Sequence, residues 1–412
     1  MAGWANVALP LPHLSAVDAE RIPHVLPPTI PGRSPRVAEF FAGIGLVRLG
    51  LEAAGLAVVW ANDVSALKQK LYAGQFTGQH FHLKDVRAVS GAEVPDIELA
   101  TASFPCTDLS LAGYRRGLVG GHSGLFWEFV RVLREMGERR PQAVLIENVI
   151  GFLTSHGGDD LRVALAALNE LGYWCDVLTI DARHFVPQSR SRLFIVASRD
   201  RLHEVQGWSA SAARSEAAVR FAREHALPRA GQPALLLQAR AVELPAHGTR
   251  TLADVVEHFT EDDPHWWDAA RVQAFLDQLS PLQRTRLDLL GARGERSWAT
   301  MYRRTRASRP AWEIRDDQLS GCLRAVSGGS SRQALVEAGA GQVRVRWMTA
   351  REYARLQGAA DYRIDTVTEN QALFGFGDAV CVPAITWLAE QYLVPLLTGT
   401  LTAHPAELLA AQ

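Results

Sequence analysis

The chain has 412 residues, of which 48% are hydrophobic and 21% charged, and a formal net charge of −1 at pH 7. This composition is typical of a soluble globular protein with about two domains, and its charge excludes a molecule-wide attraction to nucleic acid while leaving a local basic face open. The cysteines lack CxxC or CxxH spacing, which disfavours a zinc site or a disulfide framework and fits a reducing cytosol; they are Cys106, Cys175, Cys322 and Cys381. We find no apolar run of membrane-spanning length and no signal-peptide pattern, so we expect a cytoplasmic protein. Because of the cysteine spacing, we expect no metal.

The first ordered element is predicted to follow a proline-rich arm. Six prolines are scattered through residues 1–34, which predicts irregular structure there. A buried-strand pattern then begins at Val37 and runs into Gly43-Ile44-Gly45, with a helix over 46–54. A strand, a glycine turn and a helix N-terminus form the layout of a nucleotide site, because the backbone can approach a ligand there. One GxG is weak evidence, since the third glycine of the dinucleotide fingerprint is missing.

Acidic residues follow the next two predicted strands. The strand over 56–61 leads into Asn62 and Asp63, and Asp63 is placed to accept hydrogen bonds from ribose hydroxyls. Ser65 is expected to cap the following helix. Asp85 ends a third short segment, where a solvated turn aspartate is an equally good interpretation.

Residues 99–110, LATASFPCTDLS, predict a strand that opens into a loop carrying Cys106. Pro105 stiffens the turn, and the carboxyl ends of strands are where ligands collect in an open α/β sheet. A cysteine nucleophile acts as a thiolate and needs a cation, a helix N-terminus or hydrogen bonds to lower its pKa. The competing interpretation is a small buried hydrophobe. The glycine-rich segment 113–124 follows and predicts either a mobile cationic lid or an ordinary surface loop.

Polar residues end a further strand, and an alternating pattern precedes another. The strand over 143–152 carries Glu147, a costly residue among apolar neighbours unless it is paired, protonated or facing a ligand; a turn-capping role is the alternative. Alternation places Arg190 and Arg192 on one face of an extended segment, which suits phosphate or carbonyl recognition or else a structural salt bridge. The remaining elements of this part are helices over 125–139 and 161–171 and strands over 174–180 and 193–197.

Beyond Arg199 the alternation of strands and helices fades. Residues 281–315 contain nine arginines against three acids, which predicts a polyanion surface or else an inert basic face; the interleaved aromatics are Trp298, Tyr302 and Trp312. Thr349 is expected to cap a helix over 350–356. Residues 374–397 predict a glycine-rich turn entering a long apolar helix that returns to the first domain. The sequence therefore predicts an α/β domain interrupted by a recognition module.

Six motifs in this order resemble those of DNA (cytosine-5) methyltransferases. They are FAGIG (41–45), FPC (104–106), ENV (147–149), QSRSR (188–192), RVRWMTAREYARLQG (344–358) and GDAVCVP (377–383). The variable gap over 199–318 lies where this family keeps its target-recognition region. The departures are Glu39 for a commoner aspartate, Leu46 for a frequent glycine, Asp63 for a glutamate, Val64 for an aromatic residue and Asp378 for an asparagine.

The resemblance implies an α/β, Rossmann-like S-adenosylmethionine-dependent methyltransferase fold, with a mixed sheet, helices on both faces and an inserted smaller target-recognition domain. The implied division is an irregular arm (1–34), a catalytic and cofactor-binding domain (35–199), a target-recognition domain (200–371), a helix returning to the catalytic domain (372–398) and a tail (399–412).

The resemblance also implies roles for individual residues. Cys106 would attack C6 of a flipped-out cytosine, Glu147 would hold N3 and the exocyclic amine, Arg192 would donate to O2, and Arg190 would support the loop or a phosphate. S-adenosylmethionine would bind to Phe41, Ala42, Gly43, Ile44, Gly45, Asp63, Val64, Asp85, Pro105, Asp378 and Ala379. Double-stranded DNA would contact Ser110, Arg115, Arg116, Arg303, Arg304, Arg324 and Arg332.

The implied protein is a monomeric enzyme that protects DNA from a cognate restriction endonuclease, without direct contact between the two and without a membrane. One rival is a tRNA cytosine-5 methyltransferase, which the long recognition region and the missing CFT segment disfavour. A non-catalytic homologue is disfavoured because Cys106, Glu147, Arg190 and Arg192 are all present. An amino-directed DNA methyltransferase would need an Asp/Asn-Pro-Pro-Tyr/Phe motif, which is absent.

Overall fold

The computed structural model describes residues 33–105, 124–202, 208–228, 233–247, 250–306, 309–325, 332–339 and 341–401. Several predicted features lie outside these ranges: the arm up to residue 32, the lid over 113–123, the tail beyond 401, Cys106, Ser110, Arg115 and Arg116.

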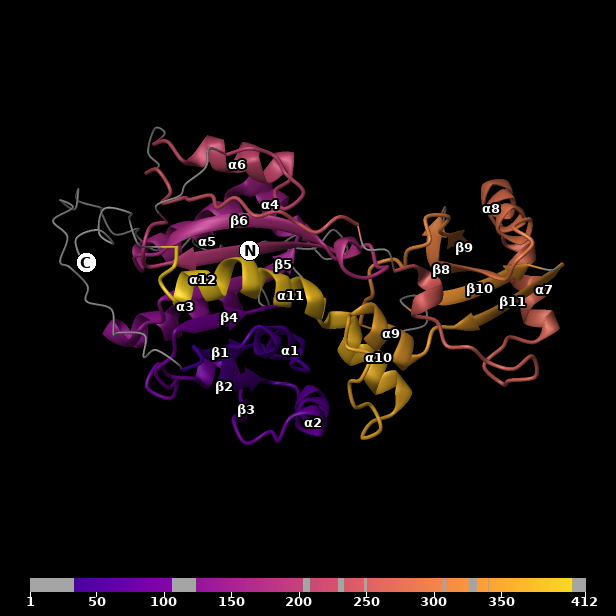
Figure 1. Ribbon diagram of the computed structural model, residues 1–412, viewed down its shortest axis with the longest axis horizontal. Coiled ribbons are helices and arrows are strands. Elements are labelled where there is room, and N and C mark those ends of the chain that lie inside the picture. The colour runs from indigo at the N-terminus through magenta and orange to yellow at the C-terminus, as the bar shows by residue number, and fades with distance from the viewer. Residues whose placement is uncertain are drawn as a thin grey trace, which may run out of the picture. The chain divides into compact units, whose positions relative to one another are not determined.

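The first part of the chain forms a seven-stranded mixed sheet (Figure 1). Its order is β3-β2-β1-β4-β5-β7-β6, and β7 runs antiparallel between β5 and β6. The strands are β1 (Arg36–Phe40), β2 (Ala57–Asp63), β3 (Phe81–Leu83), β4 (Leu99–Ala102), β5 (Ala143–Val149), β6 (Trp174–Asp181) and β7 (Ser191–Ser198). Each strand predicted in this region is present, although β5 ends three residues earlier than expected.

Helices cover both faces of this sheet, because successive residues of each strand point to opposite sides. Val37 and Leu99 belong to a core shared with α1 (Leu46–Ala53), α11 (Val382–Leu388) and α12 (Val394–Leu397). Ala38 and Phe40 pack on the other side, in a core that includes α3 (Leu125–Glu135), α5 (Asp159–Glu170) and α6 (Glu216–His225). Two more helices, α2 (Ala66–Gln75) and α4 (Gly151–Thr154), follow β2 and β5, and Ser65 caps α2 as predicted. Short 3-10 turns lie at Val86–Ala88, Gly137–Arg139, Ser155–Gly158, Ala182–His184 and Leu252–Asp254.

A second sheet of four antiparallel strands has the order β11-β10-β8-β9. It consists of β8 (Ser297–Arg306), β9 (Arg309–Ile314), β10 (Ala334–Gly339) and β11 (Gln342–Trp347), and it packs with α7 (Ala269–Asp277) and α8 (Pro281–Gly291). The expectation that the aromatics here lie on a binding surface is wrong for Trp298 and Trp312. These side chains are only 7% and 6% exposed, because they fill the apolar cores beneath this sheet.

The segment that follows residue 208 packs on the seven-stranded sheet. Leu237 forms a parallel bridge with Cys175 of β6, and the carboxylate of Asp176 accepts two hydrogen bonds from the Arg214 guanidinium at 2.6 and 2.7 Å. The division of domains at residue 200 stays a prediction, but this packing ties residues 208–240 to the first sheet.

The chain returns to the first sheet through α9 (Ala350–Leu356) and α10 (Glu369–Asp378), and Thr349 caps α9 as predicted. The predicted glycine-rich turn at 374–378 is wrong, because these residues form the last turns of α10. Gly375 allows this helix to pack closely, since a Cβ there would lie 2.9 Å from Leu71 Cδ1.

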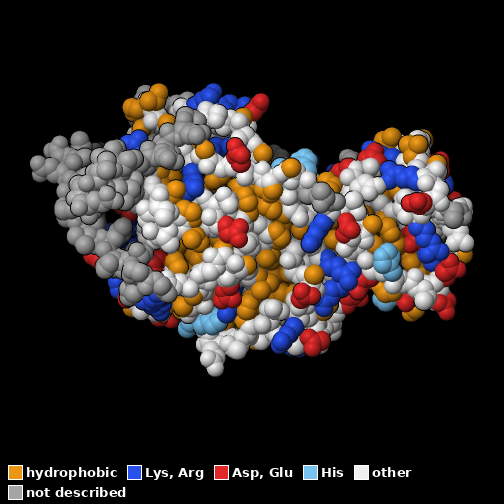
Figure 2. Space-filling model, in the orientation of Figure 1, with side chains coloured by type: hydrophobic (Ala, Val, Ile, Leu, Met, Phe, Trp, Pro, Cys, Tyr) orange, Lys and Arg blue, Asp and Glu red, His pale blue; other side chains and the backbone are white. Residues whose placement is uncertain are grey.

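The stretch Glu369–Leu397 is long and apolar enough to span a membrane by length and composition, contrary to the expectation that no run reaches this length. It is divided into α10, α11, a π-helix (Ala389–Leu393) and α12, and 72% of its most apolar window is buried inside the protein. Figure 2 shows the apolar surface that remains over α11 and α12. The stretch is therefore placed as a core helix of the fold.

Candidate active site

The glycine turn after β1 is held in a left-handed conformation. Phe41, Gly43 and Gly45 have φ of 56°, 59° and 78°. Gly45 must lack a Cβ, because that atom would lie 2.5 Å from Cε2 of Phe76. The side chains of Ala42 and Ile44 are buried, so it is the backbone of this turn that is available to a ligand. These features suit a site in which the chain approaches a bound molecule closely.

Asp63 lies beside this turn, as the predicted ribose ligand should. Its Oδ2 accepts a hydrogen bond from the Gly43 N–H at 2.9 Å, and its Oδ1 accepts one from the Ser65 N–H at 2.9 Å. The side chain of Val64 is 69% exposed. An apolar side chain exposed next to a fixed carboxylate is suited to contact the flat face of a base.

Glu39 lies one residue before the end of β1. From the sequence it stands out only because it differs from the residue common in the family motif. Its side chain is 1% exposed, and neither carboxylate oxygen has a hydrogen-bond partner among the described residues. Burial raises the pKa of Glu39 to about 8, against the opposing effect of Arg48. A buried carboxyl beside the glycine turn, whose burial the charge and the backbone N–H of Arg48 offset only in part, fits a ligand that carries positive charge.

The other predicted cofactor residues have varied surroundings. Asp85 caps a 3-10 turn by accepting from the Arg87 N–H at 2.9 Å, which agrees with the turn interpretation. Asp378 lies 3.4 Å from Lys68 Nζ. The Ala379 carbonyl accepts hydrogen bonds from two side chains behind it, Gln357 at 3.1 Å and Arg190. Pro105 is exposed at the end of the described segment after β4.

Glu147 and Arg192 form an ion pair, with 3.0 Å between Glu147 Oε1 and Arg192 Nε. The pairing of β5 with β7 explains their proximity, because Arg192 is the register partner of Val149, two residues beyond Glu147 on the same face. The side chains are 11% and 15% exposed. The structure thus brings together two of the predicted catalytic residues.

Arg190 lies deeper, at 3% exposure. Its Nη1 donates to the Leu323 carbonyl at 2.9 Å and to Cys322 Sγ at 3.2 Å, and its Nη2 donates to the Ala379 carbonyl. These contacts join Arg190 to the segments of Leu323 and Ala379, and its role in the reaction stays a prediction.

Asn148 connects this pair to the segment that leads to Cys106. Its Nδ2 donates to the Phe104 carbonyl at 3.2 Å, and its Oδ1 accepts from the Val149 N–H at 2.9 Å. The end of the segment after β4 is therefore fixed at the same sheet edge as Glu147. Cys106 itself lies outside the described residues, and its role stays a prediction.

The predicted DNA-contacting arginines differ in whether their guanidinium groups already bond to other residues of the chain. Arg303, Arg304 and Arg324 are exposed, and Arg304 lies 3.3 Å from Glu313. Arg332 donates to the Met348 carbonyl and to Glu369, both at 2.8 Å, so its guanidinium already has protein partners.

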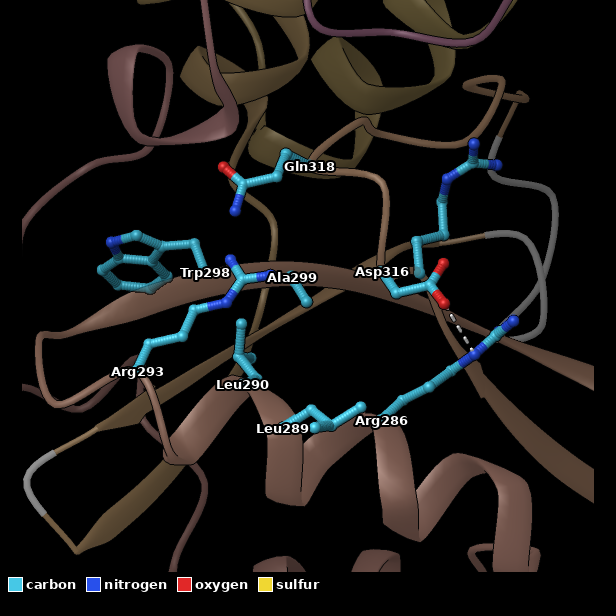
Figure 3. Close-up of a pocket in the computed structure, with 9 residues that line it drawn as sticks. Arg286, Leu289, Leu290, Arg293, Trp298, Ala299, Asp316 and Gln318 are labelled. Atoms are coloured by element: carbon cyan, nitrogen blue, oxygen red, sulfur yellow. Dashed lines mark ion pairs between the residues drawn. The ribbon is translucent and has the colours of Figure 1, made fainter.

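A crevice of about 80 Å³ lies between α8 and the second sheet (Figure 3). Arg293 and Gln318 point into the same space beside Trp298, while Arg286 pairs with Asp316 at 3.1 Å. Gln318 has a φ of 60°, a conformation that few residues other than glycine adopt. The crevice is a basic, partly apolar recess, separate from the Glu147–Arg192 pair.

Comparison with known proteins decides the family. A family model described as C-5 cytosine-specific DNA methylase matches residues 35–393. The chain belongs to this family. Its glycine turn, its Glu147–Arg192 pair and its second sheet are therefore parts of a C-5 cytosine-specific DNA methylase, and its mixed sheet is the Rossmann-like methyltransferase fold expected from the sequence.

Among curated relatives, the chain is similar to Type II methyltransferase M.Bsp6I of Bacillus sp., with 33% identity over 172 residues, which are 41% of this chain and 53% of that protein. It is also similar to Type II methyltransferase M.HhaI of Haemophilus parahaemolyticus, with 30% identity over 41% of this chain and 50% of that protein. The matched regions span about half the length of these relatives.

Two solved structures share the fold of this methylase. The Entamoeba histolytica methyltransferase EhMeth has a TM-score of 0.58 and 13% identity, and the alignment covers 90% of this chain and all of that one. The S. pombe Dnmt2 methyltransferase has a TM-score of 0.55 and 18% identity, over 88% of this chain and 99% of that one. Among the described residues, no group of three or more His, Cys, Asp and Glu side chains is arranged to hold a metal ion.

Proposed function

We propose that this methylase transfers a methyl group from S-adenosylmethionine to C5 of a cytosine flipped out of a specific sequence of double-stranded DNA, through a covalent bond between Cys106 and C6. The observation that carries the proposal is the Glu147–Arg192 pair, 3.0 Å apart at the sheet edge to which Asn148 ties the Phe104 carbonyl. A carboxyl and a guanidinium side by side offer an acceptor and a donor to the polar edge of one base.

The residues of the glycine turn suit S-adenosylmethionine as the donor. The buried oxygens of Glu39 are available to a cationic amino acid moiety, Asp63 to ribose hydroxyls, and the turn at Gly43 and Gly45 to a close backbone approach. When bound, this donor supplies a methyl group on a positively charged sulfur.

The chemistry proposed for the base uses side chains of this chain. The Cys106 thiolate forms a bond to C6, and the ring electrons shift toward C5 and toward the N3 edge, where Glu147 shares a proton with N3 and accepts from the exocyclic amine. Arg192 donates to O2. C5 then acts as a nucleophile toward the methyl group, a base removes the C5 proton, and the sulfur leaves C6 with its electron pair.

The resemblance of the chain to Type II methyltransferases supports a role in protecting DNA from a cognate restriction endonuclease. The proposed target reader is the second sheet with its exposed Arg303 and Arg304, because arginines on an antiparallel ribbon can reach phosphates and base edges. Arg332 is a weaker candidate, since Met348 and Glu369 occupy its guanidinium.

The test is methylation of DNA by the purified chain. Unmethylated genomic DNA is incubated with labelled S-adenosylmethionine and then sequenced after bisulfite treatment. We expect cytosines that resist bisulfite conversion within one sequence context. Cys106→Ser should produce none of them but should still bind S-adenosylmethionine. Label incorporated into RNA alone, or full activity of Cys106→Ser, would overturn the proposal.

A further inference from the structure

Cys322, which belongs to none of the six motifs, lies beside the catalytic pair. It lies between β9 and β10, two strands of the second sheet. Its sulfur lies 3.2 Å from Arg190 Nη1 and 3.7 Å from Arg192 Nη2. Two guanidinium groups thus share one sulfur as an acceptor, and one of the two is the partner of Glu147.

The segment of Cys322 is fixed to the first domain on both sides. Ser320 pairs with Gln188 in a parallel bridge, through hydrogen bonds from the Ser189 N–H to the Ser320 carbonyl at 2.9 Å and from the Ser320 N–H to the Pro187 carbonyl at 2.7 Å. The Leu323 N–H donates to Gln188 Oε1 at 3.2 Å. The position of the sulfur is therefore set by backbone contacts and does not depend on a free loop.

Among the described residues, at least three groups orient Arg192. Its Nε meets Glu147, its Nη1 donates to the Ser191 carbonyl at 2.9 Å, and its Nη2 meets Cys322. Removing one of these partners lets a guanidinium rotate, because a planar fork is held only when bonds on different nitrogens oppose one another. The buried Nε of Arg190 has no hydrogen-bond partner in the part of the chain that the structure describes, so Arg190 also depends on its Nη contacts.

The charges around the sulfur favour its anionic form. Burial raises the pKa of the Cys322 thiol, but Arg190, Arg192 and Arg324 together outweigh burial, so that the pKa is lower than its ordinary value of 9. As a thiol, Cys322 donates to the Leu323 carbonyl at 3.4 Å; as a thiolate, it accepts charge-assisted bonds from both arginines.

We propose that Cys322 is a positioning residue for the methyl transfer: its sulfur holds the guanidinium groups of Arg190 and Arg192, so that Arg192 keeps its contact with Glu147 and faces the base. This role rests on the proposed function, because it concerns the pocket for the flipped cytosine. Since Cys322 lies between β9 and β10 of the second sheet and contacts Arg190 and Arg192, the same contact couples the recognition part of the chain to the catalytic pair.

The test compares Cys322→Ala, Cys322→Ser and Cys322→Asp with the wild type in single-turnover methylation of cognate DNA between pH 6 and 9.5. We expect Cys322→Ala to lower the rate about tenfold, the loss typical of one charge-assisted hydrogen bond, with unchanged affinity for S-adenosylmethionine. Cys322→Asp restores an anionic acceptor and should recover most of the rate. In the wild type, the rate should rise with pH as the Cys322 thiol, which lies among Arg190, Arg192, Arg324 and Glu147, loses its proton. This rise should be absent in Cys322→Ser.

Cys175→Ser is the matched control, because Cys175 is buried in β6 and its sulfur accepts a long contact from Asn169 at 3.7 Å. Melting temperatures of all variants separate misfolding from mispositioning. A wild-type rate and an unchanged pH profile in Cys322→Ala and Cys322→Ser would overturn the role, as would a loss in all three Cys322 variants that follows their melting temperatures. If the wild type itself methylates no cytosine, it is the proposed function that fails.

Discussion

Glu147→Gln is the substitution that tests the central pair most directly. Glutamine keeps the shape of the side chain but removes the negative charge and one acceptor. Arg192 then remains at 15% exposure beside a neutral amide, and it keeps its contacts with Ser191 and Cys322. The base would lose the group that holds its N3 edge, so the variant should bind DNA but react slowly.

The magnitude follows from the burial of the pair. Removing one member of a buried ion pair costs on the order of 3–5 kcal/mol. Arg192 keeps at least two other partners, Ser191 and Cys322, so the free energy of unfolding should fall by about 3 kcal/mol, the lower end of this range. The rate constant of methyl transfer should fall by about 100-fold, the lower end of the loss typical when a group that shares a proton with the reacting base is removed.

The assay is single-turnover transfer of labelled methyl groups to cognate DNA, together with trapping on DNA that contains 5-fluorocytosine at the target. The control is Glu93→Gln, because Glu93 forms an ion pair with Lys84 at 2.8 Å in which both side chains are well exposed. Such surface pairs contribute about 0–1 kcal/mol, and this variant should keep the wild-type rate. A rate for Glu147→Gln within threefold of the wild type would refute the reasoning.

Three further predictions concern the cofactor site and the return of the chain. Asp63→Ala should raise the Kd for S-adenosylmethionine about 10- to 100-fold by calorimetry, since it removes the acceptor that fixes Gly43; an unchanged Kd would contradict the ribose role. Gly377→Ala should destabilise the fold by about 1–3 kcal/mol in urea denaturation, because the new Cβ would lie 2.1 Å from the Arg324 carbonyl carbon. Wild-type stability would show that the backbone at Arg324 can move aside at no cost. Glu39 stays protonated up to about pH 8 in the folded state, but in the unfolded state it ionises above its ordinary pKa of 4.5. Between these two pH values the folded state therefore holds more protons, and the free energy of unfolding should fall as the pH rises. Glu39→Gln should remove that slope, and a slope that persists would assign it to other groups.

Local patterns predicted the elements of the first sheet well because each depends on neighbours in the sequence. The helix after Ser65 begins where its side chain accepts from the Lys68 N–H, and Thr349 forms a capping box with Glu352. Buried-strand patterns likewise located β1, β4 and β5 to within a few residues. Caps and periodicity are local signals, which a single sequence contains in full.

The contact between Glu147 and Arg192 needed information that no local pattern holds. Both residues were predicted near strand ends, but their proximity depends on β7 entering the sheet antiparallel between β5 and β6. Cys322 is a stronger case, because 130 residues separate it from Arg192 and no motif marks it. Contacts of this kind are fixed by the order and register of strands, which must be seen in three dimensions.

In the second sheet a prediction failed for the opposite reason. The composition of one segment was taken as evidence that its aromatic residues lie on an exposed surface. Trp312 lies within an arginine-rich segment, yet it packs against Trp267, with 5.7 Å between ring centroids, and is 6% exposed. Successive residues of a strand point to opposite faces, so Arg304 lies on the face opposite Trp312, whereas Arg303 is the register partner of Trp312 and shares its face but is exposed. Counting residue types in a window cannot separate the two faces.

The same geometry determines where a recognition segment can end. The interpretation from sequence placed the end of the variable region at Gln318, and Ser320, just beyond it, pairs with Gln188 in the catalytic part of the chain. From there to Arg324 the chain lies against Arg190 on one side and Gly377 on the other. An exchange of recognition segments between relatives that extends into residues 320–324 therefore changes the wall of the proposed base pocket as well as the reader of the sequence. Target choice and catalytic rate can be altered separately only if the exchanged segment ends before Ser320.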